Sequence, residues 1–177
     1  MSKFEEERIS GEIVYAGNFI EVHHDVVRLP DGTQATRDYI RHPGAVAIVA
    51  LTDEGHVVLE RQYRYPLRRD LVEIPAGKLD PGEAHLETGK RELLEETGYS
   101  ATQWTYLGRI HNAIGYSDEA IELWLATGLK KGEAQLDEGE FLEVFTLPFK
   151  EALAMATDGR ISDVKTIVGL FWASVRR

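Results

Sequence analysis

The alternation of apolar and polar positions predicts β-strands in the first quarter of the chain. Residues 12–15 and the longer run 19–29 fit strands, and the turn Pro30-Asp31-Gly32 separates them from a third run, residues 33–41. We expect residues 1–42 to form a small antiparallel β unit.

The remainder of the chain, residues 43–177, alternates between strand and helix patterns. A helix is expected from about Ala84 to Thr97, ending at Gly98, because glycine accepts the left-handed conformation common after a helix end. A second helix starts near Pro148, and a third follows, capped by Ser162. The pattern of the third helix predicts one core-facing apolar stripe: Val164, Ile167, Val168, Phe171 and Val175. Strands are expected at residues 44–51, 56–63, 71–74, 105–110, 119–127 and 141–147. This order predicts an α/β/α sandwich of the α+β class, with a mixed sheet, following the small β unit.

Composition excludes several classes of function. The 177 residues include 30 acidic and 20 basic ones, giving a formal net charge of −10, and no long basic stretch, so duplex nucleic acid is not an expected partner. The chain has no cysteine, which excludes disulfides, thiolate metal sites and cysteine nucleophiles. The first ten residues are too charged for a signal peptide, and the longest apolar run, residues 44–51, is too short to span a membrane. We expect a cytoplasmic protein without membrane partners.

Three glutamates in the predicted helix 84–97 have a spacing that suggests metal binding. Glu92 and Glu96 are four residues apart and share one helix face, with Glu95 beside them. Like charges at this spacing destabilise a helix unless a cation lies against them, and Mg²⁺ prefers such hard oxygen ligands. The alternative is a solvated acidic face in which Arg91 pairs with Glu95.

The segment that contains this helix, residues 77–99, resembles the signature box of the Nudix family. The matching residues are Gly77, Glu83, Arg91-Glu92-Leu93, Glu95-Glu96 and Gly98. Tyr99 departs from the pattern, because an aliphatic residue is more usual there. The resemblance extends over most of the chain, which looks like the branch of the family that acts on ADP-ribose and other nucleoside diphosphate sugars.

The resemblance implies a Nudix-type fold and roles for the residues of the box. It implies that Glu92, Glu95 and Glu96, together with the backbone carbonyl of Ala76, bind Mg²⁺, for which Mn²⁺ can substitute. It also implies that Arg91 orients these acids rather than contacting substrate.

The resemblance further implies that a glutamate on a mobile loop after the box activates the attacking water. The matching loop here contains Glu138 and Glu140, separated by Gly139. We prefer Glu140 as the base because it adjoins the following strand, and Glu138 stays open as the alternative.

Five further residues match positions that bind substrate in this branch. Arg64 matches an arginine that contacts the phosphates or distal ribose, and Glu73 an acid that binds a sugar hydroxyl or pairs with that arginine. Arg37 matches an arginine that reaches the partner subunit's nucleotide site, and Phe19 an aromatic that stacks on the base. Glu119 belongs to a Ser-Asp-Glu segment typical of the branch. Without the resemblance, Arg64 would be interpreted as a surface residue and Phe19 as a core residue.

The expected activity is Mg²⁺-dependent hydrolysis of a nucleoside diphosphate sugar to a nucleoside monophosphate and a sugar phosphate. Ile114 stands where the ADP-ribose branch usually has proline, so the base and sugar stay open. The alternatives are another Nudix activity, on dinucleoside polyphosphates or nucleoside triphosphates, and a sensor without catalysis. The branch also implies a homodimer with shared active sites, in which residues 1–42 dimerise and cover the partner's substrate, while residues 43–177 form the hydrolase domain.

Overall fold

The computed structural model describes residues 2–136 and 138–176 and divides into two compact units. The first comprises Met1–Gly44 and His111–Ala120, and the second Ala45–Ile110 and Ile121–Arg177.

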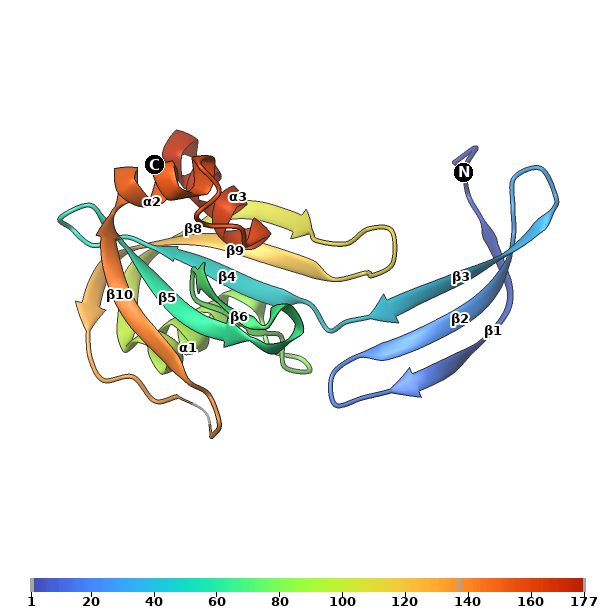
Figure 1. Ribbon diagram of the computed structural model, residues 1–177, viewed down its shortest axis with the longest axis horizontal. Helices are drawn as coiled ribbons and strands as arrows, with labels where there is room; N and C mark the ends of the chain where they lie inside the picture. The colour runs from blue at the N-terminus through green and yellow to red at the C-terminus, as the bar shows by residue number, and fades with distance from the viewer. Residues whose placement is uncertain (1, 137, 177) are drawn as a thin grey trace. The chain divides into compact units, whose positions relative to one another are not determined.

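A three-stranded antiparallel sheet in the order β1-β2-β3 forms most of the first unit (Figure 1). Its strands are β1 (Glu7–Ala16), β2 (Glu21–Arg28) and β3 (Gln34–Arg41). The sheet and the turn at Asp31 were predicted, but β1 is longer than the pattern of residues 12–15 indicated. The turn is fixed by Asp31, whose Oδ1 accepts hydrogen bonds from the backbone N–H and hydroxyl of Thr33 at 2.9 and 2.6 Å.

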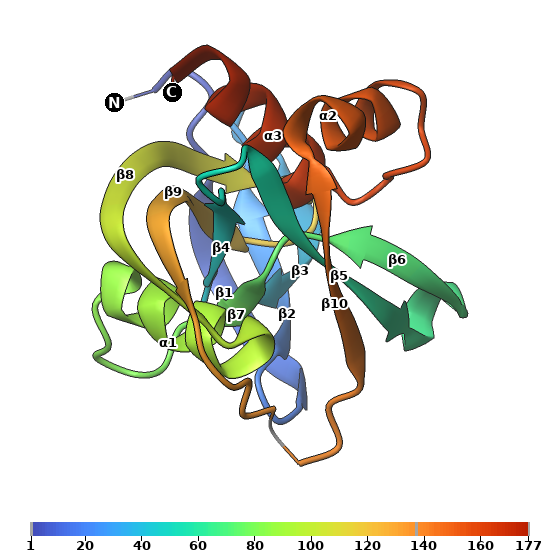
Figure 2. The same cartoon turned by 90° about the vertical axis from the view of Figure 1, so that its left-hand side faces the viewer.

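Two sheets form the second unit, in the orders β10-β5-β6 and β7-β4-β9-β8 (Figure 2). The strands are β4 (Ala45–Ala50), β5 (His56–Arg64), β6 (Arg69–Glu73), β7 (Ala76–Lys78), β8 (Tyr99–His111), β9 (Ala120–Lys131) and β10 (Leu142–Pro148). β4 pairs parallel to β9 and antiparallel to β7, so the predicted mixed sheet is confirmed. The short strand β7 was not predicted, and β8 and β9 are both longer than expected.

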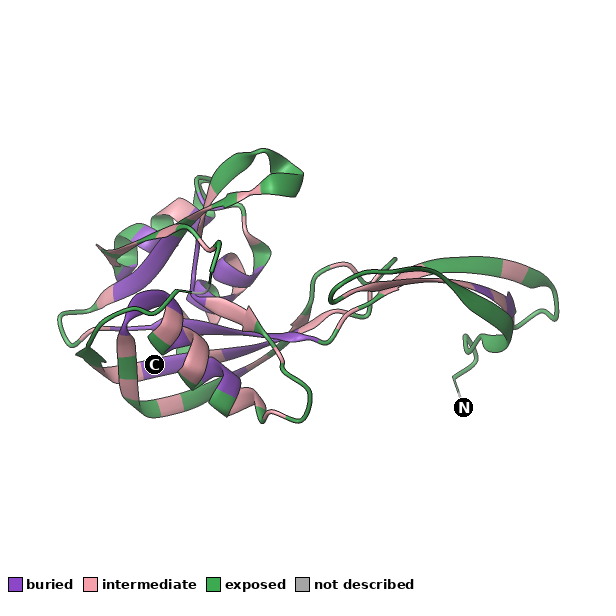
Figure 3. Ribbon diagram, turned by 90° about the horizontal axis from the view of Figure 1, so that it is seen from below, coloured by how far each residue is buried: buried purple, intermediate pink, exposed green. Residues whose placement is uncertain are grey.

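Helices cover both faces of β4. α1 (His85–Thr97) packs on one side, while α3 (Val164–Arg176), which follows α2 (Phe149–Thr157), packs on the other (Figure 1). Residues of β4 alternate accordingly: Val46 and Ile48 join the cluster with Leu93 of α1, whereas Val49 joins the cluster with Leu170 of α3. β4 is therefore buried along its whole length (Figure 3). This is the layered α+β arrangement that the sequence predicted.

The start of α3 differs from the prediction. Asp163, not Ser162, caps the helix, because its Oδ2 accepts a hydrogen bond from the backbone N–H of Thr166 at 3.0 Å. The hydroxyl of Ser162 instead accepts a hydrogen bond from Arg69.

The predicted core-facing stripe of α3 was wrong in part. Ile167 and Val168 do pack against the core, but Val164, Phe171 and Val175 are 44, 43 and 76% exposed. The helix is instead buried through Thr166, Gly169, Leu170 and Ala173. A Cβ at Gly169 would lie 3.0 Å from Val49, so the missing side chain lets this face approach β4 closely. Among the helices of the described residues, none is long and apolar enough to span a membrane.

Candidate active site

The helix α1 carries the acidic box residues and lies close against β4. Gly98 ends the helix in the left-handed region at φ 72°, with its N–H donating to the carbonyl of Leu94 at 2.8 Å, as the sequence predicted. Gly89 allows the close approach, because a Cβ there would lie 3.2 Å from Val46. A glycine costs a helix about 1 kcal/mol relative to alanine, and the tight contact accounts for its presence here.

Arg91 holds the acids of the box in place. Its Nη1 donates to Glu92 at 2.9 Å and to Glu95 at 3.0 Å, while its Nε and Nη2 donate to Glu83 at 3.2 and 3.0 Å. The hydrogen bonds that Arg91 donates to Glu83 are the largest cause of its raised pKa. Arg91 therefore stays charged and donates hydrogen bonds to three carboxylates. This geometry suits the orienting role expected for it.

Glu96 and Glu92 lie where α1 meets the start of β7. Glu96 is only 4% exposed, and its Oε2 accepts a hydrogen bond from the backbone N–H of Ala76 at 3.0 Å. The carboxylate of Glu92 fills the space in which a Cβ of residue 77 would stand, so glycine at this position lets the carboxylate approach the backbone. The structure thus places Ala76, Gly77, Glu92 and Glu96 together.

Burial makes this cluster unfavourable as a set of free anions. Burial raises the pKa of Glu96 above its ordinary range, and the charges of Glu60 and Glu92 raise it further. Burial likewise raises the pKa of Glu92, against the effect of Arg91. Such a site favours a cation that lets the carboxylates ionise.

The chemistry of this donor set fits a divalent metal ion. Glutamate oxygens and a nearby backbone carbonyl are hard ligands of the kind that Mg²⁺ and Mn²⁺ take. Within the described part of the chain, no three acidic, histidine or cysteine side chains form a ready-made metal site. The hydrogen bonds from Arg91 to Glu92 and Glu95, and from the N–H of Ala76 to Glu96, each use one oxygen of the carboxylate.

Glu140, in the loop before β10, lies within electrostatic range of this cluster. Glu140 is half-buried, and its negative charge contributes to the raised pKa of both Glu92 and Glu96. Glu138 is exposed, and Gly139 between them has a φ of 85°. Asp137, in the same loop, lies outside the described residues.

A buried ion-pair network links β5, β6 and α3. Arg64 donates from Nε and Nη2 to the two oxygens of Glu73 at 2.6 and 2.7 Å. Lys165, 8% exposed, donates to Glu73 and to Asp163. Burial alone would raise the pKa of Glu73, but Arg64 and Lys165 together hold it below its ordinary value. The side chain of Arg64 is 40% exposed but is therefore anchored through its bidentate pairing with the buried Glu73.

Sequence reasoning missed Lys165 and also Glu60. Glu60 lies on β5, fully buried, and neither of its carboxylate oxygens has a hydrogen-bond partner among the described residues. The only sequence feature that indicates its burial is its spacing from Val58. Residues two apart on a strand share one face, and the side chain of Val58 belongs to the core cluster under α1. A glutamate followed by Arg61 at the end of an apolar run otherwise suggests the solvent-exposed end of a strand.

The other predicted substrate-binding residues belong to the first unit. Arg37 on β3 donates two hydrogen bonds to Glu6, at 2.9 and 2.5 Å. Phe19, in the β1–β2 turn, is half exposed and packs edge-to-face on His42 with ring centroids 5.5 Å apart. Glu119 accepts a hydrogen bond from Asn112 at 3.2 Å. Ile114, at the position where proline was expected, is exposed.

Family models match nearly the whole chain. The model of the NUDIX domain matches residues 41–167, and the model of the nucleoside diphosphate sugar hydrolase N-terminal domain matches residues 6–40.

Similar proteins include two pyrophosphatases and a methanol dehydrogenase activator. An ADP-ribose pyrophosphatase of Bacillus subtilis is 38% identical, covering 99% of this chain and 96% of its own. A methanol dehydrogenase activator of Bacillus methanolicus is 44% identical, with 94% and 91% covered. A GDP-mannose pyrophosphatase of Yersinia enterocolitica is 33% identical, with 96% and 95% covered.

The fold agrees with these matches. A crystal structure of an ADP compounds hydrolase superposes with a TM-score of 0.86 at 23% identity, covering 98% of this chain and 95% of the other. With the box residues assembled on α1 and against β7, and with the NUDIX domain matched over residues 41–167, the chain belongs to the Nudix family.

Proposed function

We propose that this protein hydrolyses the diphosphate linkage of nucleoside diphosphate sugars with Mg²⁺, giving a nucleoside monophosphate and a sugar phosphate. The observation that carries the proposal is the meeting of Glu92 and Glu96 with Ala76 and Gly77 around one buried anionic cluster. The relatives named pyrophosphatases of ADP-ribose and GDP-mannose support the substrate class.

The roles proposed for the residues are those that the resemblance to the family implies, and the clustering of Glu92 and Glu96 with Ala76 supports them. Glu92, Glu95, Glu96 and the carbonyl of Ala76 would hold the divalent cation. When bound, the cation neutralises the diphosphate, polarises the P–O bond and lowers the pKa of a water. Arg91 keeps the carboxylates oriented.

Proton transfer and substrate orientation fall to residues outside α1. Glu140 accepts the proton of the attacking water at a carboxylate oxygen. Arg64, fixed by Glu73 on one edge of its guanidinium, keeps its remaining N–H groups for phosphate oxygens.

A product-resolved assay with Mg²⁺ separates this proposal from its alternatives. The panel is ADP-ribose, GDP-mannose, UDP-glucose, NADH, a diadenosine polyphosphate and a nucleoside triphosphate. We expect a nucleoside monophosphate and a sugar phosphate from at least one sugar nucleotide, with the highest kcat/KM in that class. Preference for a polyphosphate or triphosphate would indicate another Nudix activity. Binding without turnover of any compound would indicate a sensor.

The role of Glu140 is tested by replacing it with glutamine. We expect Glu140→Gln to lower kcat about 10²-fold with little change in KM, because a general base acts mainly in the transition state. Glu138→Gln, in the same loop, is the matched control and is expected to keep most of the activity. A larger loss in Glu138→Gln would exchange the two roles.

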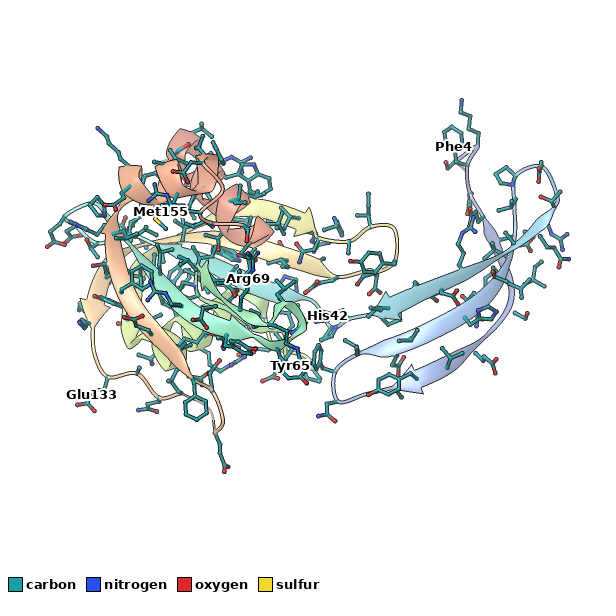
Figure 4. All side chains as sticks on the ribbon, in the orientation of Figure 1. Phe4, His42, Tyr65, Arg69, Glu133 and Met155 are labelled. Atoms are coloured by element: carbon teal, nitrogen blue, oxygen red, sulfur yellow. The ribbon has the colours of Figure 1, made fainter. Side chains whose placement is uncertain are left out.

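The proposed assembly is a two-fold homodimer in which residues 1–42 cover the partner's site. In the single chain, every residue of β1 is exposed, including Ile9, Ile13, Val14 and Tyr15. Phe4, in the segment before β1, is 72% exposed as well (Figure 4). A sheet that leaves so much apolar surface uncovered favours association, and two-fold dimers are the commonest oligomers. The absence of cysteine is compatible with a cytoplasmic location.

Shared sites predict complementation between two defective variants. Arg37→Ala should mainly raise KM, and Glu96→Gln should remove turnover. After subunit exchange, a heterodimer carries one site with both defects and one with neither, so part of the activity returns. Arg28→Ala serves as the control, because Arg28 is an exposed arginine of the same sheet that pairs with Glu7. Activity no greater than the sum of the separate variants, once exchange is verified, would mean that each chain builds its own site.

A further inference from the structure

Glu60 is the one buried carboxylate of the second unit that lacks any hydrogen-bond partner among the described residues. It lies in the interior of the central strand β5, opposite Glu73 on β6 and Val144 on β10. Burying an ionised carboxylate without a partner costs several kcal/mol, so such a residue indicates a missing counter-charge. The position has no structural hydrogen bond that would account for a charged side chain.

Glu60 lies on the face of β5 that carries Val58, which belongs to the core layer under α1. Val58 packs in the core cluster with Leu93 of α1. Glu60 is two residues further along β5 on the same face, and Glu96 is three residues further along the same side of α1. The two carboxylates are close enough that the charge of Glu60 affects Glu96 more than the charge of Glu92 does.

Nearby cations are already engaged by other acids. Lys165 donates to Glu73 and Asp163, and Arg64 donates both of its bonds to Glu73. Both cations favour the ionised form of Glu60, but neither forms a hydrogen bond with it in the described structure. Glu60 therefore has negative charges of Glu73, Glu96 and Glu140 around it and no direct counter-ion.

We propose that Glu60 binds a divalent cation together with Glu96, as an additional carboxylate of the metal site on the side of β5. This inference rests on the proposed function, because the cation is the one that the box residues hold. The box spacing alone does not include this residue, since Glu60 lies on a strand that precedes the box. The cation supplies the counter-charge that both buried carboxylates lack.

The test measures Mn²⁺ binding directly rather than activity. Mn²⁺ is titrated into metal-free wild-type protein and into Glu60→Gln, and free Mn²⁺ is followed by its EPR signal. We expect Glu60→Gln to bind at least one Mn²⁺ at least about tenfold more weakly, or to lose one ion from the stoichiometry. Glu60→Leu, which replaces the carboxylate by an apolar group of similar size, repeats the measurement if glutamine disturbs folding.

Thermal unfolding in EDTA and in Mn²⁺ gives a second readout. Without metal, Glu60→Leu is expected to be at least as stable as wild type, because it removes a buried carboxyl group that has no hydrogen-bond partner among the described residues, and Mn²⁺ should raise its Tm less. Glu122→Gln is the matched control, a buried glutamate on β9 that is paired with Tyr106 and Arg109. It should lose stability without metal and keep wild-type Mn²⁺ affinity.

Glu96→Gln separates failure of this inference from failure of the proposed function. If Glu96→Gln loses Mn²⁺ while Glu60→Gln and Glu60→Leu bind it like wild type, the metal site stands and the role of Glu60 is refuted. If wild type itself binds no Mn²⁺, the metal-dependent function and the role of Glu60 are both refuted.

Discussion

Replacing Glu96 by glutamine is expected to lower kcat at least about 10²-fold while leaving the protein folded. Glutamine keeps the shape of the side chain and an oxygen that can accept the N–H of Ala76. It removes one negative charge from the cluster with Glu92, so a divalent cation is held less well. Without metal, the variant should be no less stable than wild type, because burial disfavours the charged form of Glu96.

The measurement is kcat at saturating Mg²⁺, together with thermal unfolding of the same samples. Glu87→Gln is the matched control, since Glu87 is an exposed acid of the same helix that pairs with Lys90. Its kcat should stay near that of wild type. Turnover by Glu96→Gln above about a third of the wild-type value would mean that the metal assignment is wrong.

Glu73→Gln is expected to reduce the free energy of unfolding by about 3 kcal/mol at pH 7. The substitution leaves Lys165 buried without its main counter-charge and removes the bidentate partner of Arg64. Urea unfolding followed by circular dichroism measures the loss. The double variant Glu73→Gln/Lys165→Met also removes the buried cation that has lost its counter-charge. It should therefore regain part of the lost free energy of unfolding.

The difference in stability between wild type and Glu73→Gln is expected to depend on pH. The pKa of Glu73 is lower in the folded protein than its ordinary value, so its stabilisation is present above the ordinary value and is lost as pH falls through the folded value. Wild type and Glu73→Gln should therefore converge in stability under acid conditions. A difference below about 0.5 kcal/mol at pH 7 would contradict the structural importance of this network.

Local patterns were sufficient to predict most elements of the fold. The end of α1 was predictable because Gly98 accepts the left-handed conformation that follows a helix. The buried strand β4 was predictable because its residues form a continuous apolar run. β7 has no such signal, because its three residues form a strand only through pairing with β4. The buried face of α3 was misjudged because close packing through Gly169 outweighs the larger apolar side chains elsewhere on the helix.

The residues of the candidate site were predictable only where their spacing in the sequence shows that they lie together. Glu92 and Glu96 share a helix face by periodicity alone, and the box resemblance added Ala76 and Arg91. Glu60 and Lys165 were not predicted as site residues, because the burial of a charged side chain depends on neighbours from distant segments. A single sequence does not reveal these neighbours.

The proposed activity is tested most directly by resolving the products formed from ADP-ribose and GDP-mannose in H₂¹⁸O, with Mg²⁺ and with EDTA. With Mg²⁺, we expect a nucleoside monophosphate and a sugar phosphate, with a single ¹⁸O in one of the two phosphate groups. With EDTA, neither product should form. Equal rates in Mg²⁺ and EDTA, or no nucleoside monophosphate from either substrate or any other nucleoside diphosphate sugar, would contradict metal-dependent hydrolysis of this linkage.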